Sequence, residues 1–445
     1  MRTQLSFPAA LAACGIAYGA TMPAALIVNG GDSTLDLKQL PSGTLRRNIA
    51  GLPNYATGVA VWGDHAYVTG SGDDRIARID LVSETVELDW MTLPAFSNPW
   101  GVAIRDAHHG YVVLSALNAV QAFDPTNAEL VGDPIEVGNW PQGCELYGDR
   151  LLVAVTGFDT ETFGYVDPAV TAIDLDDWTV EATTETHVNP QDVAVFDGRV
   201  FAVCTGDWGA IESAVEVLDA STLASIDRID VGGTAGSIAI DRDGVGYLGD
   251  SGFLSMGIYT FDAASHILLR GPGDPLSSDA TSALLSDERR GALLSTTYDF
   301  FAGTLIEWSW PGLVPVGADP IGGGPVSMAL WDEPLISVAA DALTPNPAHG
   351  GDLVTLTGTV TNNSDIALDA MLELDLYLPD GSAYPRNPVL SSPVLGFGPS
   401  SPRVFSVQEV LPINMPLGDY TLVGRVFDRD GGTQHDAETV QLTVW

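Results

Sequence analysis

The chain has 445 residues, of which 45% are hydrophobic, and a formal net charge of −40 at pH 7. This length and apolar share fit two globular domains, or one large β domain with a smaller one. The negative charge argues against nucleic acid as a partner and against binding to anionic lipid through a basic patch, because nucleic acids and anionic lipids both present phosphate groups. We interpret the acidity as a solubilising surface, and a surface for a cationic partner or for calcium is the alternative.

The first 23 residues are typical of an export signal. Arg2 precedes an apolar run that is too short to span a membrane as a mature helix. The sequence LAAC, ending at Cys14, resembles a bacterial lipobox, in which the cysteine is lipidated and becomes the new N-terminus. Ordinary cleavage at residues 17–20 is the alternative. Either way we expect an exported protein, in the bacterial cell envelope (periplasm or surface lipoprotein) or secreted, with membrane contact only through that lipid.

From residue 24 to residue 333 the chain repeats a unit of four short strands. Residues 99–138 are the clearest unit, with strands separated by Gly, Asn, Asp and Pro. The third strand of most units ends in an apolar residue and an aspartate, at Asp80, Asp124, Asp174, Asp219 and Asp262. We interpret these aspartates as turn residues whose side chains accept hydrogen bonds from nearby backbone amides.

A second mark, the residues that lead into the first strand of a unit, occurs seven times. The third-strand end near Gln39 has no first strand before it, and the first strand after Gly323 has no third strand after it. We therefore predict that SMALW at residues 327–331 supplies the innermost strand beside the N-terminal strands. The predicted fold class is all-β, a seven-bladed β-propeller closed by N-terminal strands, which leaves no exposed edge at either end of the array.

The repeats resemble a known family. AYVTG at residues 66–70, SGDDRIARID at 71–80 and NPWGVAI at 98–104 are similar to repeats of the bacterial YVTN or YncE-like propellers, within the WD40/YVTN-like repeat superfamily. The resemblance covers residues 24–333, with an insertion around residues 159–167 and no aspartate in the unit that ends at Trp310. It implies the fold rather than a function, because such propellers have many unrelated roles.

Residues 334–445 have a different pattern, with about seven strands in roughly 110 residues, which is typical of an immunoglobulin-like β-sandwich. GTVTNNS at residues 358–364 and LGDYTLVGRV at 417–426 resemble the CARDB-type adhesion modules of bacterial surface proteins. We expect this module to act as a spacer or as a second contact surface.

The cysteines and the acidic loops do not indicate a metal. If Cys14 is lipidated, Cys144 and Cys204 remain as a pair in an oxidising compartment, either as a disulfide or as two inert buried thiols. Their spacing is not that of zinc ligands. Residues 241–244 and 428–431 faintly resemble calcium loops, but neither continues to the glutamate that an EF-hand needs. We predict no cofactor, and calcium remains possible but unsupported.

We expect binding at the face where the first strands begin. In propellers of this kind the loops that lead into the innermost strands gather around the central channel. The candidate ligand-binding residues in these loops are Asn54, Tyr55, Asn98, Trp100, Asn139, Trp140, Asn189, Gln191, Asp192 and Asp279. Together they would form a polar pocket with stacking surfaces, and residues 158–166 would form a lip over one face. The alternative is that the asparagines cap turns and the tryptophans pack between blades.

The sequence contains no G-x-S-x-G nucleophile elbow and no H-E-x-x-H zinc motif. GDSG at residues 249–252 repeats a string found around the nucleophile of chymotrypsin-like proteases, but the rest of that pattern is absent, and we interpret it as a coincidence. We therefore expect an exported, non-catalytic binding, adhesion or scaffold protein that presents a propeller face to a protein, a glycan or a small polar ligand. The alternative is a propeller enzyme of the lactonase, lyase or quinoprotein-like class, acting at the channel face.

Overall fold

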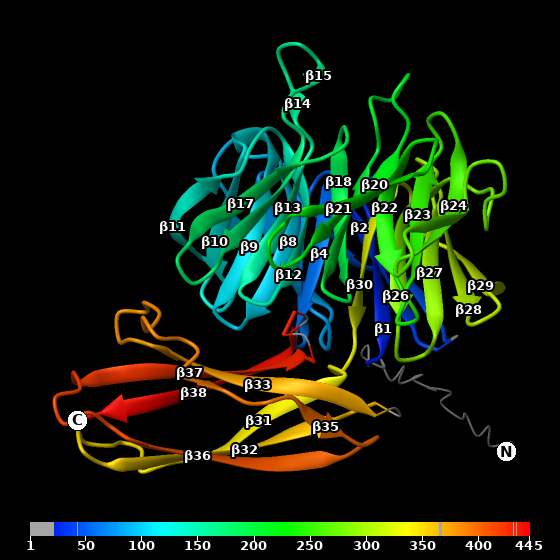
Figure 1. Cartoon of the computed structure of the whole chain (residues 1–445). Helices are drawn as coiled ribbons and strands as arrows, with labels where there is room; N and C mark the ends of the chain where they lie inside the picture. Colours follow the sequence, from blue (N-terminus) through cyan, green and yellow to red (C-terminus); the bar gives the residue numbers. More distant parts are fainter. Residues whose placement is uncertain (1–21, 42, 365–366, 430, 433) are drawn as a thin grey trace, which may run out of the picture.

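The computed structural model describes residues 22–445 except positions 42, 365–366, 430 and 433. Cys14 and the predicted lipobox lie outside the described residues. The described chain is all-β, with one short 3-10 helix, η1 (Ser115–Leu117). None of its helices is long and apolar enough to cross a membrane. Figure 1 shows a ring of sheets seated on a flatter two-layer unit.

Seven four-stranded antiparallel sheets form the ring in the described chain. The strands of each sheet, from the innermost to the outermost, are β30 (Pro325–Trp331), β1 (Ala24–Asn29), β2 (Thr34–Gln39) and β3 (Leu45–Gly51); β4 (Ala56–Trp62), β5 (His65–Gly70), β6 (Arg75–Asp80) and β7 (Thr85–Thr92); β8 (Pro99–Asp106), β9 (His109–Leu114), β10 (Ala119–Asp124) and β11 (Glu129–Glu136); β12 (Pro141–Tyr147), β13 (Arg150–Val155), β16 (Ala169–Asp174) and β17 (Thr179–Glu185); β18 (Pro190–Phe196), β19 (Arg199–Cys204), β20 (Ala214–Asp219) and β21 (Ser225–Asp230); β22 (Ala235–Ile240), β23 (Val245–Ser251), β24 (Met256–Asp262) and β25 (Ile267–Arg270); β26 (Thr281–Asp287), β27 (Ala292–Thr297), β28 (Thr304–Ser309) and β29 (Val314–Pro320).

The innermost strands contact one another in the order β4, β8, β12, β18, β22, β26 and β30, and β30 contacts β4 again. This arrangement is that of a β-propeller. β1 pairs with β2 on one side and with β30 on the other, with Leu26 opposite Ala329. The offset between the two repeat marks predicts this pairing, and the structure confirms it.

Burial follows from the stacking of the sheets. The second strands are almost wholly buried, as in β13, because a neighbouring sheet covers each face. Outermost strands such as β11 are mostly exposed. The aspartates that end the third strands have the predicted role, since each accepts a backbone N–H two or three residues further on, at 2.7–3.1 Å. β14 (Phe158–Asp159) and β15 (Gly164–Tyr165) form a separate hairpin that protrudes at the predicted lip (Figure 1).

The C-terminal unit is built from two sheets that face each other across an apolar core. One sheet has the order β31 (Ile336–Thr344), β32 (Leu353–Asn362) and β36 (Pro402–Val410). The other has the order β34 (Leu390–Ser391), β33 (Leu368–Tyr377), β37 (Gly418–Asp428) and β38 (Gln434–Val444), and β35 (Leu395–Phe397) also pairs with β33. We call this unit the sandwich.

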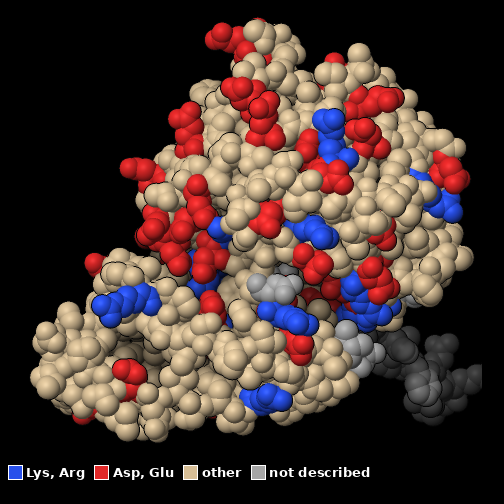
Figure 2. Space-filling model, viewed as in Figure 1, with Lys and Arg blue, Asp and Glu red and all other residues tan. Residues whose placement is uncertain are grey.

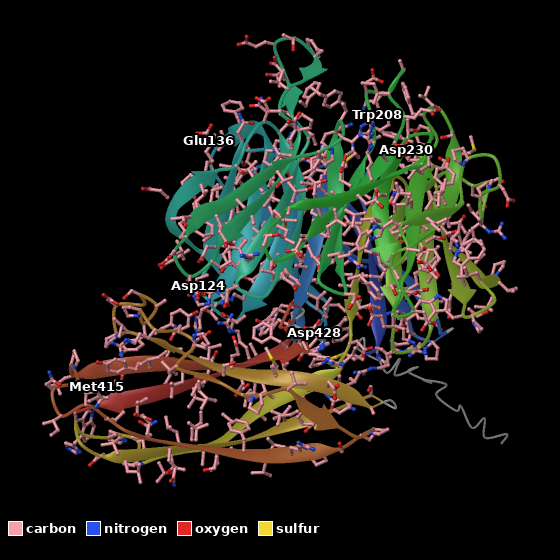
Figure 3. The ribbon with its side chains drawn as sticks, viewed as in Figure 1. Asp124, Glu136, Trp208, Asp230, Met415 and Asp428 are labelled. Atoms are coloured by element: carbon pink, nitrogen blue, oxygen red, sulfur yellow. The ribbon has the colours of Figure 1, made fainter. Side chains whose placement is uncertain are left out.

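The sandwich is joined to one end of the ring by charged and aromatic side chains. Asp149, in the turn between β12 and β13, accepts hydrogen bonds from Arg105 of β8 and, at 2.6 Å, from Arg425 of β37. Both guanidinium groups are buried. Tyr377 of β33 stacks on His109 of β9, with ring centroids 5.0 Å apart. Figure 3 places the labelled Asp428, which ends β37, at this junction. The junction fixes which end of the ring the sandwich covers.

Candidate functional site

A cavity of about 1160 Å³ lies along the axis of the ring. Residues 332–334, which connect the ring to the sandwich, and residues 434–437 at the start of β38 line it at the sandwich end. Trp208 and Tyr298, from loops at the opposite face, line its other end, and Tyr298 is exposed. The cavity is therefore bordered by the sandwich at one end and reaches solvent at the other.

Each innermost strand has a register shift against the second strand of its sheet near its start. A β-bulge of this kind re-aims side chains, and here two successive residues of every innermost strand line the cavity. The first tier is Thr57, Trp100, Gln142, Gln191, Gly236, Ser282 and Val326. The second tier is Gly58, Gly101, Gly143, Asp192, Ser237 and Ser327, and the corresponding residue of β26, Ala283, is buried.

The two halves of the second tier differ in chemistry. On one side a side chain would collide with the next strand, since a Cβ on Gly58 would lie 2.4 Å from the carbonyl oxygen of Trp100. On the other side are one carboxyl group, that of Asp192, and two hydroxyls, those of Ser237 and Ser327. The hydroxyls of Ser237 and Ser327 have no hydrogen-bond partner in the described part of the chain. These hydroxyls and the carboxyl group give the cavity one polar half.

Two acidic side chains in the cavity have pKa values well above those of free carboxyl groups. The protein around the cavity removes part of the water around Glu145 on β12 and raises its pKa to about 8, although the side chain is exposed to the cavity, and the negative charge of Asp192 adds to the effect. Enclosure likewise raises the pKa of Asp192 to about 7, although the amide of Val193, 3.0 Å away, stabilises its ionised form. No Lys or Arg is among the described residues that line the cavity. Nothing there offsets these charges, and the cavity favours cations and hydrogen-bond donors.

The sandwich contributes two further titratable groups to the cavity. Burial lowers the pKa of His435, and burial raises the pKa of Asp436 to about 6. The carboxylate of Asp436 accepts a hydrogen bond from the amide of Val338, at 2.8 Å. Within the described ranges, no group of three or more His, Cys, Asp or Glu side chains is placed to hold a metal ion.

Of the ten residues predicted from the sequence, the structure brings three together in the cavity: Trp100, Gln191 and Asp192. The other seven are not among the lining residues: Asn54, Tyr55, Asn98, Asn139, Trp140, Asn189 and Asp279. Their role in binding stays a prediction.

Several of these seven residues organise the turns before the innermost strands. Tyr55, Asn98, Trp140 and Asn189 all have φ values between 47° and 62°, the left-handed region that asparagine tolerates better than most residues. The side chain of Asn189 is buried and donates to the carbonyl oxygen of Gly206 at 3.2 Å. This contact favours the capping role.

Glu145 is the carboxyl-bearing residue of an innermost strand that lines the cavity and that the sequence analysis missed. It lies at the position of β12 that corresponds, by strand register, to Ala60, Ala103, Ala194, Ala239, Leu285 and Ala329 in the other innermost strands. A carboxyl group in a set of small apolar residues was the available signal. An alignment of the seven units strand by strand would have revealed it.

The sequence left open a disulfide or two separate thiols for Cys144 and Cys204, and in the structure both are free thiols. Cys144 lines the cavity on β12, whereas Cys204 ends the buried second strand of the next sheet, so that the two lie on separate elements. Burial raises the pKa of each thiol well above its usual range.

Two acidic motifs singled out in the sequence serve the fold. Asp250, in the GDSG string, is fully buried and accepts hydrogen bonds from the amide of Thr234 at 2.8 Å and from the hydroxyl of Tyr259 at 3.0 Å. Asp241 accepts hydrogen bonds from the amide of Val245 and the hydroxyl of Tyr247. Both carboxylates organise turns, and the protease string is a coincidence of sequence.

No protein-family model and no curated protein sequence matches the chain. Solved structures do match. A chain of hydrazine synthase from Kuenenia stuttgartiensis is 13% identical, with a TM-score of 0.50 over 62% of this chain and 92% of that one. A chain from a crystal structure of the mitotic checkpoint complex is 12% identical, with a TM-score of 0.51 over 75% of this chain and 95% of that one. At such identities the likeness shows the propeller-like fold alone.

Proposed function

We propose that the protein is an exported, non-catalytic binding protein that takes a small polar ligand into the channel of a seven-bladed, YVTN-like β-propeller at residues 24–333. We assign residues 334–445 to an immunoglobulin-like, CARDB-like module that carries the propeller. The seven four-stranded sheets, the contacts around the ring and the two facing C-terminal sheets support this division. The signal pattern at residues 1–23 supports export, and Cys14 is the proposed site of a lipid anchor.

The polar half of the second tier carries the proposal. Asp192, Ser237 and Ser327, together with Ser282 of the first tier, offer a carboxyl group and hydroxyls along one side, and Glu145 adds a second carboxyl group. A ligand with hydroxyl groups and an ammonium group satisfies both. Trp100, on the first tier, supplies a flat surface on which a sugar ring or an organic cation can stack. Anionic ligands are disfavoured by the same carboxyl groups.

The test is calorimetric titration of the mature protein with amino sugars, neutral sugars and polyamines. We expect the ammonium compounds to bind. The polyamines, whose alkylamine groups stay protonated like that of lysine to about pH 10, should bind more tightly at pH 9 than at pH 6, because Glu145 and Asp192 ionise in between. The variant D192N should weaken binding at least tenfold. The matched control D279N changes an exposed aspartate that does not line the cavity, and should leave binding unchanged. Equal losses in both variants would contradict the channel site.

A propeller enzyme of the lactonase, lyase or quinoprotein-like class is the second candidate. The observation that favours it is the pair of carboxyl groups with pKa values of about 8 and about 7, which suits general acid–base chemistry near neutral pH. If the protein turns over a compound that binds, and E145Q loses this turnover but keeps its affinity for the compound, the protein is an enzyme rather than a binding protein.

The partner could also be a protein or a glycan whose end enters the channel mouth. The structural neighbour from the mitotic checkpoint complex is part of a protein assembly. We therefore propose that a protein partner should be tested here as well. The mature N-terminus, read by mass spectrometry, tests the anchor: a lipidated Cys14 that is lost in C14A supports it, and cleavage at residues 17–20 contradicts it.

A further inference from the structure

The loop face opposite the sandwich has an unusual surface. We call this surface the rim. It consists of the loops that join second to third strands and the loops that join one sheet to the next, at residues 30–33, 52–55, 71–74, 93–98, 115–118, 137–140, 156–168, 186–189, 205–213, 231–234, 252–255, 271–280, 298–303 and 321–324. Figure 3 places Trp208, which also lines the cavity, on this face.

Exposed aromatic side chains are concentrated on the rim. The described chain exposes eight large aromatic side chains, and seven of them lie there: Tyr55, Phe96, Phe163, Phe253, Tyr298, Phe300 and Phe301. The eighth is Trp445. Phe96 and Phe301 are 84% and 83% exposed. Since soluble proteins rarely gather exposed apolar residues on one face, such a surface marks an interaction site.

Half-buried aromatic neighbours support several of these exposed rings. Phe253 meets Trp208 edge to face, with centroids 5.4 Å apart. Phe163 rests against Phe158, which in turn contacts Trp140, with centroids 6.2 and 5.7 Å apart. Since the rings pack on one another, little side-chain entropy is lost when a partner covers them.

The charge of the rim has a single sign. Its loops contain eleven acidic residues and none of the chain's 18 Lys and Arg residues. The acidic residues are Asp32, Asp73, Asp74, Asp159, Glu161, Asp167, Asp207, Glu212, Asp274, Asp279 and Asp299. Figure 2 shows acidic side chains at the tip of the β14–β15 hairpin, and basic ones lower down, toward the sandwich. The rim therefore combines exposed rings with carboxylates, of which Asp274 is paired with an arginine just outside the loops, Arg270 at 3.6 Å.

We propose that the rim docks a basic, arginine-rich segment of another protein. A guanidinium group can stack on an aromatic face and at the same time pair with a carboxylate, so that one residue type satisfies both features of the rim. A second copy of this chain would set eleven carboxylates against eleven. An anionic membrane would be repelled, and a neutral glycan would cover the carboxylates without a counter-charge. This inference does not depend on the channel ligand, because it uses different residues.

The test measures binding of a fluorescent 15-residue peptide of alternating Arg and Gly to the full mature protein at 150 mM salt. Two substitutions that preserve charge, F163A/F301A, should weaken binding at least tenfold. The control I413A/V404A removes equally exposed apolar side chains from the sandwich and should change binding less than twofold. The pair E161Q/E212Q should weaken binding at least fivefold, whereas E409Q/D419N, which makes the same change in charge on the sandwich, should not.

Each other outcome overturns the proposal. If both acidic pairs weaken binding equally and the aromatic pair has no effect, the peptide responds only to the overall negative charge. If the wild-type protein does not bind the peptide, the partner chemistry is wrong. If it sediments as a dimer that F163A/F301A dissociates, or binds neutral phosphatidylcholine vesicles through these rings, the occupant is a second copy or a lipid surface. D192N should retain peptide binding, so a failure of the channel site is told apart from a failure of the rim.

Discussion

Substitution of Arg425 by Met should destabilise the protein through the carboxylate that it leaves behind. The side chains of Arg425 and Asp375 are each only 1% exposed, and their ion pair lies on the sheet that faces the ring. One oxygen of Asp375 accepts from Arg425, and the other has no partner in the described residues. The second partner of Arg425, Asp149, retains Arg105 and is partly exposed. The cost is therefore concentrated at Asp375.

Removal of one member of a buried ion pair costs about 3–5 kcal/mol, because the remaining charge is unpaired. Replacement of both members by apolar groups of similar size is often neutral or stabilising. We expect R425M to lower the free energy of unfolding by about 3–5 kcal/mol, and D375L combined with it to recover most of that loss. The control R386M removes an exposed arginine and should change stability by less than about 0.5 kcal/mol.

The measurement is urea denaturation of each variant, followed by far-ultraviolet circular dichroism, with the transition of the sandwich analysed separately if two transitions appear. A double-mutant cycle then gives the coupling between Arg425 and Asp375. The reasoning is refuted if R425M costs less than about 1 kcal/mol, or if the double variant is as unstable as the single one.

Three further predictions concern the carboxyl groups and the thiols. Because the pKa of Glu145 is raised from 4.5 to about 8, the folded state keeps its proton to higher pH than the unfolded chain does. The stability of the wild type relative to E145Q should therefore fall as the pH rises from about 4.5 to about 8. A stability difference between the two proteins that does not change with pH would contradict this. D250A should lower the free energy of unfolding, measured by thermal denaturation, by about 2–4 kcal/mol, because it leaves buried donors such as the hydroxyl of Tyr259 without an acceptor. D250N should lower it by less. The reverse order would be inconsistent with these contacts. Cys144 and Cys204 should resist alkylation by iodoacetamide at pH 8 while the protein is folded, and both should react after the protein is unfolded without reductant. The mass of the protein reports the number of alkylated thiols. Alkylation of the folded protein would show that the pKa values of the thiols are not raised.

The ring could be predicted because its construction is repeated in the sequence. Aspartates such as Asp124 recur where a third strand ends, since the turn needs an acceptor for its amides. The offset of the two marks sufficed to pair β1 with β30, because an unpaired strand at either end would leave an exposed edge.

The lining of the channel could not be predicted with the same accuracy. A β-bulge decides which residues face the axis, and it is formed here with Gly, Ser or Asp at the second position, so no single residue type announces it. For this reason Asp192 lines the cavity, whereas Asn189, three residues earlier in the chain, does not. The junction between the ring and the sandwich could not be predicted from the sequence, because Arg105, Asp149 and Arg425 come into contact only when both units are folded.

The position of the sandwich links the two proposals. Residues 434–437 and the connecting residues 332–334 border the channel at one end, and Trp208 and Tyr298 line the end that opens onto the rim. Trp208 also belongs to the rim, where it supports Phe253. A segment docked across the rim would then cover the same mouth through which the ligand exchanges. It follows from the two proposals together that partner binding and ligand exchange compete at one opening, and that a docked partner slows release of a ligand already inside.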